Sequence, residues 1–319
     1  MSCISLRGPG YPNCCGEVME RIGLTDVPVF PLQALAYLAS HACSGHCLHC
    51  SFSDLCRVDD YDPVVSKEAL GDPPDYLSFL SLTGGEPLDF PDRSLQLVEM
   101  AGAVGLRVSV VTSGAFARVW PVARAWIDSA AERGLHEIAL SVDRFHRPAL
   151  TGEQRVLLVK HCLARDVKVH LKGLSFGAED MIDAVLAAVG DDPRVTRSLS
   201  GLERVGRAED LGEVFSGKTG GPCHNLVEPG VFPSGQVYAC CSVFGMRMQG
   251  SALQIGHLKA ETLAEILDRF RRDYLFAALR YLGPMTMRGW LPIGLKKRVE
   301  AYKGCELCIG MMSDKESVE

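Results

Sequence analysis

The sequence lacks the features that mark secreted, membrane-spanning and nucleic-acid-binding chains. Residues 1–24 contain no basic start followed by a continuous apolar run, and no later stretch is long enough to span a bilayer. A concentrated basic field is also missing, because the net charge is -6 and the acidic and basic residues are interspersed. We therefore expect a cytoplasmic protein with no nucleic-acid or membrane partner, whose partner is a small molecule or a peptide.

Internal repeats and low-complexity segments are absent as well, and the feature that stands out is the set of 13 cysteines among 319 residues. Disulfides are disfavoured in a reducing compartment, where clustered thiols more often bind metal. Three cysteines lie within residues 43–50, Cys240 and Cys241 are adjacent, and Cys305 and Cys308 form a CxxC pair. This spacing indicates metal or cluster ligands instead of cross-links.

From about residue 32 onward, apolar strand-like segments alternate with amphipathic helices. The expected strands are residues 34–39, 76–82, 108–112, 137–142, 168–171 and 195–199. The expected helices are residues 93–104, 122–133, 152–164 and 178–189. Thr151 and Gln154 provide a capping box at the start of the third helix. This alternation predicts an α/β fold with a parallel sheet and right-handed crossovers, in about six units, which is enough for an open partial barrel.

Composition divides the chain into an N-terminal extension, a barrel and a cysteine-rich C-terminal domain. These three parts are expected at residues 1–30, 31–215 and 216–319. The last part follows a loop-forming Ser-Gly-Lys-Thr-Gly-Gly-Pro stretch. It is expected to hold a short hairpin at 231–239, one helix from 262 to about 279, and an irregular tail carrying Cys305 and Cys308.

Cys43, Cys47 and Cys50 form a CxxxCxxC motif directly after the first expected strand. Three thiolates on one tight loop can hold a four-iron cluster and leave the fourth iron open to a ligand. A zinc site or three buried structural thiols are the alternatives. The motif resembles the radical S-adenosylmethionine (SAM) superfamily, in which the open iron takes the amino and carboxylate groups of SAM. The resemblance implies a SAM-binding [4Fe-4S] cluster, SAM itself, and an electron donor such as flavodoxin or ferredoxin.

Residues at the ends of the expected strands resemble the SAM-binding positions of that superfamily, over about residues 32–210. The GGEP segment is similar to the one whose backbone and glutamate bind the SAM amino group. By the same resemblance, Ser113, Ser141 and Asp143 would contact the carboxylate and ribose of SAM, and His49 stands where an aromatic residue packs against adenine. Ordinary turn residues are the alternative. The expected SAM contacts are therefore His49, Gly84, Gly85, Glu86, Ser113, Ser141 and Asp143.

The cysteines of the C-terminal part have an order of their own. Cys223, Cys240, Cys305 and Cys308 supply four thiolates, enough for one cluster or one zinc ion. Their order resembles the shortened "twitch" form of the SPASM domain, which implies a second, auxiliary [4Fe-4S] cluster, with zinc as the runner-up. Thiols that are not ligands are expected at Cys3, Cys14, Cys15, Cys56 and Cys162.

Cys241 lies beside a presumed cluster ligand and is the candidate catalytic residue. Two adjacent cysteines do not easily ligate one cluster, and a thiol can give a hydrogen atom to a carbon radical, as a cysteine does in radical SAM peptide epimerases. A small residue in a cysteine-rich turn is the alternative.

Three functions remain open. The resemblance implies that a 5′-deoxyadenosyl radical abstracts hydrogen from an unactivated carbon of a natural-product substrate, a peptide or an aminoglycoside, with epimerisation ranked first. A dehydrogenase that resembles the twitch-bearing aminocyclitol dehydrogenases is ranked second. A non-catalytic iron–sulfur electron carrier is ranked third, because it leaves the GGEP segment and the strand-end polar residues without a role.

Overall fold

The computed structural model describes residues 29, 31–50, 52, 58–146, 148–175, 178–202, 206–211, 221–223, 225–241, 249–300 and 304–313. The chain divides into two compact units, which are described separately. The barrel unit comprises Ala34–Phe215 with Phe232–Ser234. The C-terminal unit is built mainly from Ser216–Val231 and Gly235–Glu319. Apart from residue 29, the expected N-terminal extension lies outside the described residues, as do Cys3, Cys14, Cys15 and Cys56.

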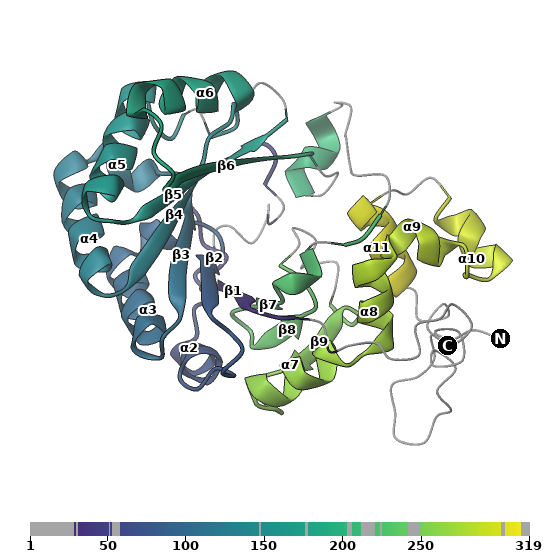
Figure 1. Ribbon diagram of the computed structural model, residues 1–319. Coiled ribbons are helices and arrows are strands. Elements are labelled where there is room, and N and C mark those ends of the chain that lie inside the picture. The colour runs from purple at the N-terminus through teal and green to yellow at the C-terminus, as the bar shows by residue number, and fades with distance from the viewer. Residues whose placement is uncertain are drawn as a thin grey trace. The chain divides into compact units, whose positions relative to one another are not determined.

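The sheet of the barrel unit consists of parallel strands in the order β6-β5-β4-β3-β2-β1 (Figure 1). Their bounds are β1 Ala34–Leu38, β2 Phe79–Thr83, β3 Arg107–Thr112, β4 Leu135–Ser141, β5 Lys168–Leu174 and β6 Val195–Ser200. All six expected strands are present, with ends shifted by a few residues. Because every strand runs the same way, all six carboxyl ends lie at one edge of the sheet, where α/β folds place their sites.

In the described part of the barrel unit, the α-helices run along one side of the sheet (Figure 1). Their bounds are α2 Pro63–Leu70, α3 Pro91–Ala103, α4 Trp120–Glu132, α5 Gly152–Ala164 and α6 Ala178–Val189. The capping box of Thr151 and Gln154 is present at the start of α5. Sequence analysis missed α2, a short helix that begins where Asp62 accepts a hydrogen bond from the Val64 N–H at 2.8 Å.

The two faces of the sheet differ in chemistry, as the alternation of side chains along a strand requires. On β2, Leu80 and Leu82 are fully buried on the side that the helices cover, while the alternate residues Phe79, Ser81 and Thr83 are only half-buried. The opposite face is polar: Ser109 donates to Glu137 at 2.8 Å, and His170 lies 2.6 and 2.7 Å from two hydroxyl groups of β6. The inner side of the partial barrel is therefore lined with hydrogen-bonding groups.

The described part of the C-terminal unit contains a small antiparallel sheet and short helices. The strands are β7 Gly230–Val231, β8 Gln236–Tyr238 and β9 Gln254–His257. The helices are α7 Leu263–Arg271, α8 Tyr274–Tyr281, α9 Gly283–Arg288, α10 Ile293–Arg298 and α11 Gly304–Ser313. The expected hairpin is present as β7 and β8. No helix in the described part of the chain combines the length and the apolar character needed to cross a bilayer.

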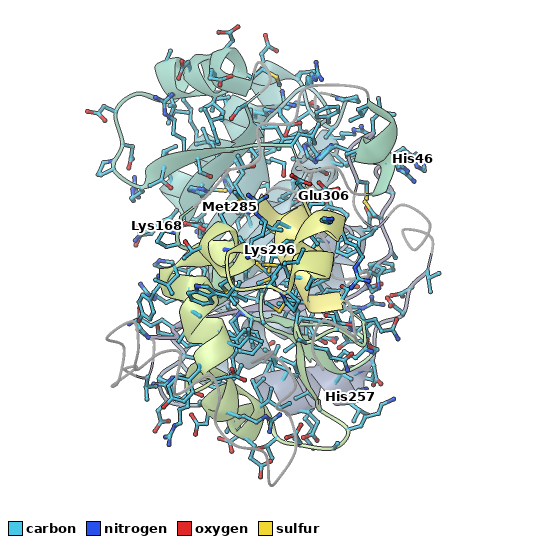
Figure 2. All side chains as sticks on the ribbon, turned by 90° about the vertical axis from the view of Figure 1, so that its right-hand side faces the viewer. His46, Lys168, His257, Met285, Lys296 and Glu306 are labelled. Atoms are coloured by element: carbon cyan, nitrogen blue, oxygen red, sulfur yellow. The ribbon has the colours of Figure 1, made fainter. Side chains whose placement is uncertain are left out.

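Two expectations for this unit were wrong. The single helix expected over 262–279 is two helices, because the backbone of Asp273 is extended and its side chain caps α8 by accepting from the Leu275 N–H at 2.8 Å. The expected irregular tail is mostly helical, and Cys305 and Cys308 lie on α11. Figure 2 labels Glu306, which α11 carries between these two cysteines. The sequence does not predict α11, because this helix is apolar on nearly every side and its hydrophobic residues show no helical period.

Candidate functional site

The loop that follows β1 carries the cysteine triad, and all three thiol side chains are partly exposed. Gly45 lies between two of them: its N–H is 3.3 Å from Cys43 Sγ. A Cβ at this position would lie 3.2 Å from Cys43 Sγ and 3.7 Å from Cys47 Sγ. A side chain at position 45 would therefore press against Cys43 Sγ, and glycine lets the loop bring the sulfurs of Cys43 and Cys47 toward the same residue.

One group of metal-ligating side chains in the described part of the chain is compact. The ligand atoms of His49, Asp143 and His146 lie within 4.8 Å of one another. The binding of a four-iron cluster by the cysteine triad stays a prediction.

The GGEP segment packs against the backbone that leads into the cysteine loop. The Gly85 N–H donates to Ser40 O at 2.8 Å, and the Glu86 N–H donates to Ala42 O at 3.0 Å. A Cβ on Gly84, whose φ is +136°, would lie 2.4 Å from Ser40 O, and one on Gly85 would lie 2.0 Å from Ala42 O. Both glycines are therefore required by the close approach of two backbones.

Gly85→Ala is expected to destabilise the protein and to disturb the cysteine loop, because its Cβ would overlap Ala42 O. Overpacking of this kind costs about 1–3 kcal/mol, and rigid backbone neighbours place it at the upper end. Gly152→Ala is the matched control, since a Cβ there meets nothing within 4 Å and alanine favours helix. Anaerobic urea unfolding and iron content measure both effects. Equal unfolding midpoints for the two variants would contradict the close packing.

Glu86 is almost fully buried, and both of its carboxylate oxygens accept hydrogen bonds. Oε1 accepts from Thr112 Oγ1 at 2.7 Å, and Oε2 accepts from the N–H and Oγ of Ser113 at 2.9 and 2.6 Å. Burial raises the pKa of Glu86 above its ordinary value, against the opposing effect of these hydrogen bonds. Glu86 therefore joins the ends of β2 and β3 and fixes Ser113. A contact from Glu86 to the SAM amino group stays a prediction.

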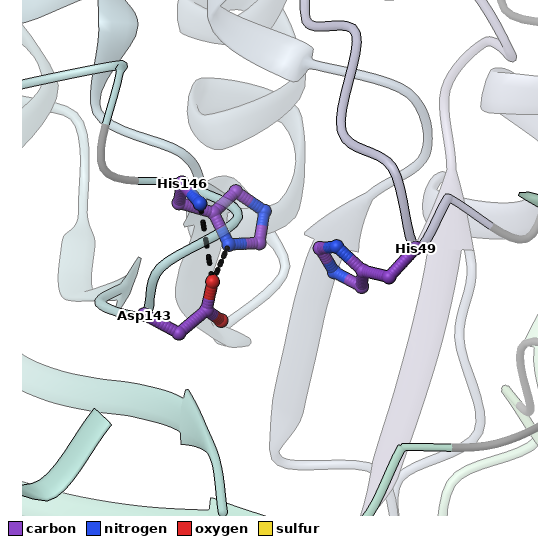
Figure 3. Close-up of side chains that lie close together, drawn as sticks. All are labelled: His49, Asp143 and His146. Atoms are coloured by element: carbon purple, nitrogen blue, oxygen red, sulfur yellow. Dashed lines mark hydrogen bonds and ion pairs between the residues drawn. The ribbon is translucent and has the colours of Figure 1, made fainter. Parts of the chain in front are cut away.

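Asp143 is buried after β4, which ends at Ser141, and His146 beside it is partly buried (Figure 3). Asp143 Oδ1 accepts from the N–H groups of Phe145 and His146 at 2.9 and 3.1 Å, and lies 2.9 Å from His146 Nδ1. Asp143 therefore fixes both the backbone and the ring of His146.

The charges of this pair stabilise each other. Burial opposes a charge on His146, but its hydrogen bond to Asp143, with the influence of Cys47, raises its pKa to about 10. Burial alone would raise the pKa of Asp143, but its hydrogen bond to His146 holds that pKa below its ordinary value. The pair is therefore joined by a hydrogen bond between opposite charges.

His49 packs against the same pair and faces it in Figure 3. Its ring centroid lies 4.7 Å from that of Phe145 and 4.9 Å from that of His146. Burial, with the charge of His146, lowers the pKa of His49 to about 4. The ring is therefore neutral at physiological pH and planar, which suits stacking on a base. Its Nδ1 is buried without a hydrogen-bond partner among the described residues, which fits a polar ligand at this position.

In the C-terminal unit, three of the four expected auxiliary ligands lie close together. Cys305 and Cys308 are one turn apart on α11, and Cys223 is anchored by Arg280, whose Nη1 donates to Cys223 O at 2.9 Å. Burial, with the electrostatic influence of the nearby Cys223 and Cys305, raises the pKa of the Cys308 thiol. Cys240 follows β8. The binding of a cluster by these four residues stays a prediction.

Cys241, the candidate hydrogen-atom donor, is hydrogen-bonded to Glu228. Its Sγ lies 3.3 Å from Glu228 Oε2, and its N–H donates to Glu228 O at 2.9 Å. Because an ionised carboxylate only accepts, this contact makes the Cys241 sulfur an S–H donor. A thiolate ligand has no proton to give, so the contact fits a thiol beside a cluster ligand.

Comparison with known proteins addresses the fold. No family model and no curated protein match the sequence. Among solved structures, anSMEcpe with bound AdoMet (SAM) and Cp18Cys peptide is 16% identical, with 91% of this chain and 92% of that chain covered and a TM-score of 0.52. The fold is a partial radical SAM barrel. Streptococcus suis SuiB bound to precursor peptide SuiA is 12% identical, with 86% and 73% covered and a TM-score of 0.48.

The predicted α/β fold class, a partial (β/α)6 radical SAM barrel with a separate small unit, is therefore confirmed. Two contacts at the carboxyl edge of this barrel were not foreseen. The sequence near His146 does indicate its contact with Asp143, since an aspartate that follows a strand commonly caps a turn and can hold a residue three positions later. No local pattern indicates the contacts of Arg207, whose N–H donates to Cys50 O at 3.0 Å and whose Nη1 donates to Cys47 O at 3.4 Å. The second of these hydrogen bonds joins residues 160 positions apart.

Proposed function

We propose that this protein is a radical SAM enzyme that abstracts a hydrogen atom from an unactivated carbon of its substrate. The observation that carries the proposal is the approach of the Cys43 and Cys47 sulfurs to one residue, Gly45, on a loop whose leading backbone accepts hydrogen bonds from the GGEP segment. Cys43, Cys47 and Cys50 would hold a [4Fe-4S] cluster and leave one iron for SAM. When bound and reduced, the cluster and SAM supply a 5′-deoxyadenosyl radical. The AdoMet bound to anSMEcpe, which shares the fold, supports this assignment.

The side chains near the cysteine loop and the GGEP segment have separate roles in the proposal. The backbone of the GGEP segment binds the SAM amino group, and Glu86 holds Ser113 toward the SAM carboxylate. Asp143 accepts hydrogen bonds from the ribose hydroxyls, and Ser141, the last residue of β4, contacts SAM beside it. His49 stacks its neutral ring on adenine. These residues bind and orient SAM without changing charge.

The C-terminal unit would hold an auxiliary [4Fe-4S] cluster on Cys223, Cys240, Cys305 and Cys308. The convergence of three of these thiols supports the assignment, and zinc remains the alternative at this site. The first cluster needs one electron for each SAM cleaved, which a flavodoxin or ferredoxin would supply.

For the reaction type we propose epimerisation of a peptide or aminoglycoside carbon, with Cys241 as the hydrogen-atom donor. The radical left on the Cys241 sulfur would take up one further electron from the flavodoxin or ferredoxin and one proton from solvent, which restores the thiol. The S–H contact to Glu228 supports this role, because a donor must keep its proton until the substrate radical forms. The Cp18Cys peptide bound to anSMEcpe supports a peptide over a sugar. The alternative is a dehydrogenase whose auxiliary cluster accepts the second electron, and the convergence of Cys223, Cys305 and Cys308 is the observation that favours it.

The class of reaction is tested without knowledge of the substrate. Anaerobically reconstituted protein is reduced with dithionite and incubated with SAM, and 5′-deoxyadenosine and methionine are measured by mass spectrometry. The proposal predicts both products in equal amounts, even if cleavage is slow when substrate is absent. A protein that is fully loaded with iron and forms neither product would contradict it, and would favour an electron carrier.

A further inference from the structure

The sheet of the barrel unit carries a row of polar side chains near its carboxyl edge. Lys172 on β5 is the register partner of Ser141 on β4 and of Ser198 on β6. Register partners on neighbouring parallel strands point to the same face of a sheet, and the strands lie about 4.8 Å apart. An ammonium group and two hydroxyl groups therefore lie side by side on three consecutive strands.

The contacts of β5 and β6 show that this row is on the inner face of the partial barrel. Arg197 forms an ion pair with Asp183 of α6, so its side chain is on the side that the helices cover. Ser198, the next residue, points to the opposite side, where its Oγ is 2.7 Å from His170 Nε2. Lys172 follows His170 by two positions and so shares its face.

The positive charge of Lys172 is not balanced by the protein on this face. In the described part of the chain, no carboxylate lies within ion-pair distance of its ammonium group, and the residue is exposed. Glu137, which β4 carries on the same face, accepts from Ser109 Oγ at 2.8 Å and is the register partner of Lys168. Burial lowers the pKa of His170, so its ring adds no charge at physiological pH. The row therefore offers one cation, with hydroxyl groups on both sides, to an anionic group of a ligand.

The place of the row relates it to the chemistry of the site. Parallel α/β sheets bind their ligands at the carboxyl ends of the strands. Ser141 is an expected SAM contact, so a group held by Lys172 would lie beside bound SAM. A carboxylate can accept from an ammonium group and from a hydroxyl group at the same time. A polycationic aminoglycoside would instead meet a like charge here, which is unfavourable.

We propose that Lys172, together with the Ser198 hydroxyl held by His170, binds a carboxylate group of the substrate, and that the substrate is therefore an acidic peptide and not an aminoglycoside. The inference rests on the proposed function, because it requires a substrate that binds beside SAM. It deepens that function by naming a residue that selects the substrate.

The test is a binding experiment with the full-length reconstituted protein and SAM, without a reductant, so that SAM stays intact. The protein is dialysed to equilibrium against a library of linear peptides in matched pairs that differ only by Glu or Gln at one position, together with a set of aminoglycosides. Mass spectrometry identifies the retained compounds. The wild-type protein is expected to bind the Glu member of the retained pairs about tenfold more tightly than its Gln partner, and to retain no aminoglycoside.

Three variants show whether Lys172 causes this preference. Lys172→Met removes the charge but keeps an unbranched side chain, and is expected to bind Glu and Gln members equally. Lys172→Arg keeps a cation with hydrogen-bond donors and is expected to retain most of the preference. Lys168→Met is the matched control, because Lys168 is exposed on the same face of the same strand, nearer its amino end (Figure 2), and it should behave like wild type.

The amount of SAM retained in the same dialysis separates the substrate carboxylate from the carboxylate of SAM. The inference is overturned if Lys172→Met keeps the wild-type preference for Glu, or if it binds SAM about tenfold more weakly while that preference stays. Wild-type protein that binds SAM but retains aminoglycosides, or retains no acidic peptide, overturns it as well. Wild-type protein that binds no SAM contradicts the proposed function instead.

Discussion

Replacement of Cys43, Cys47 and Cys50 together with alanine is expected to abolish SAM cleavage and to leave one four-iron cluster where the wild-type protein has two. The triad lies on one loop of the barrel unit, while Cys223, Cys305 and Cys308 belong to the C-terminal unit, so each set would bind its own cluster independently. Iron and sulfide analysis, with mass spectrometry of 5′-deoxyadenosine, measures both outcomes after anaerobic reconstitution.

Cys162→Ala is the matched control, because this thiol is fully buried on α5 and is not an expected ligand. It is expected to lower stability slightly, through the small cavity it leaves, and to keep both clusters and SAM cleavage. Cleavage that survives the triple replacement would show that the triad is not the SAM site. A protein that binds zinc but no iron at its second site would correct the auxiliary-cluster assignment and leave the triad untouched.

Cys241→Ala is expected to separate the two leading reactions. If the protein is an epimerase, the variant should cleave SAM and abstract hydrogen at nearly the wild-type rate, because neither step uses this thiol, while inverted product disappears. In deuterated water, the wild-type product should gain one deuterium at the inverted carbon, since the S–H proton held against Glu228 exchanges with solvent before transfer. Product mass, measured over a panel of linear peptides and aminoglycosides, provides the readout.

A dehydrogenase gives a different pattern in the same experiment. Its product lacks two hydrogens, carries no solvent deuterium at the reacting carbon, and depends on the auxiliary cysteines but little on Cys241. Glu228→Gln serves as a second variant, because it keeps a group that can accept the Cys241 S–H without the negative charge. A product lighter by two hydrogens, formed equally well by Cys241→Ala, would end the epimerase proposal.

Much of the barrel could be predicted because its signals are local. The six strands are short apolar runs between amphipathic helices, and Thr151 and Gln154 form the capping box that begins α5. The cysteine triad also lies within one loop, so its spacing alone suggested its chemistry. In contrast, α2 has only eight residues and α11 is apolar on nearly every side, so neither shows a clear helical period.

The contacts around the site were less predictable, because they join segments that are distant in sequence. No local pattern indicates that Glu86 accepts hydrogen bonds from Thr112 and Ser113, or that Arg207 closes the cysteine loop. The need for glycine at position 85 was equally hard to predict, because the atom that it approaches is the backbone oxygen of Ala42, in the segment that follows β1. Sequence spacing predicted the types of ligand, and only the fold showed which groups surround these residues.

Direct binding of SAM to a cluster held by the triad can be seen by electron paramagnetic resonance (EPR) spectroscopy of the reduced, reconstituted protein, recorded with and without SAM. We expect SAM to change the signal of one cluster and to leave the other as it was, and we expect the SAM-sensitive signal to be missing from the triple alanine variant. A spectrum that is unchanged by SAM, from a protein with its full complement of iron, would show that SAM does not bind to a cluster.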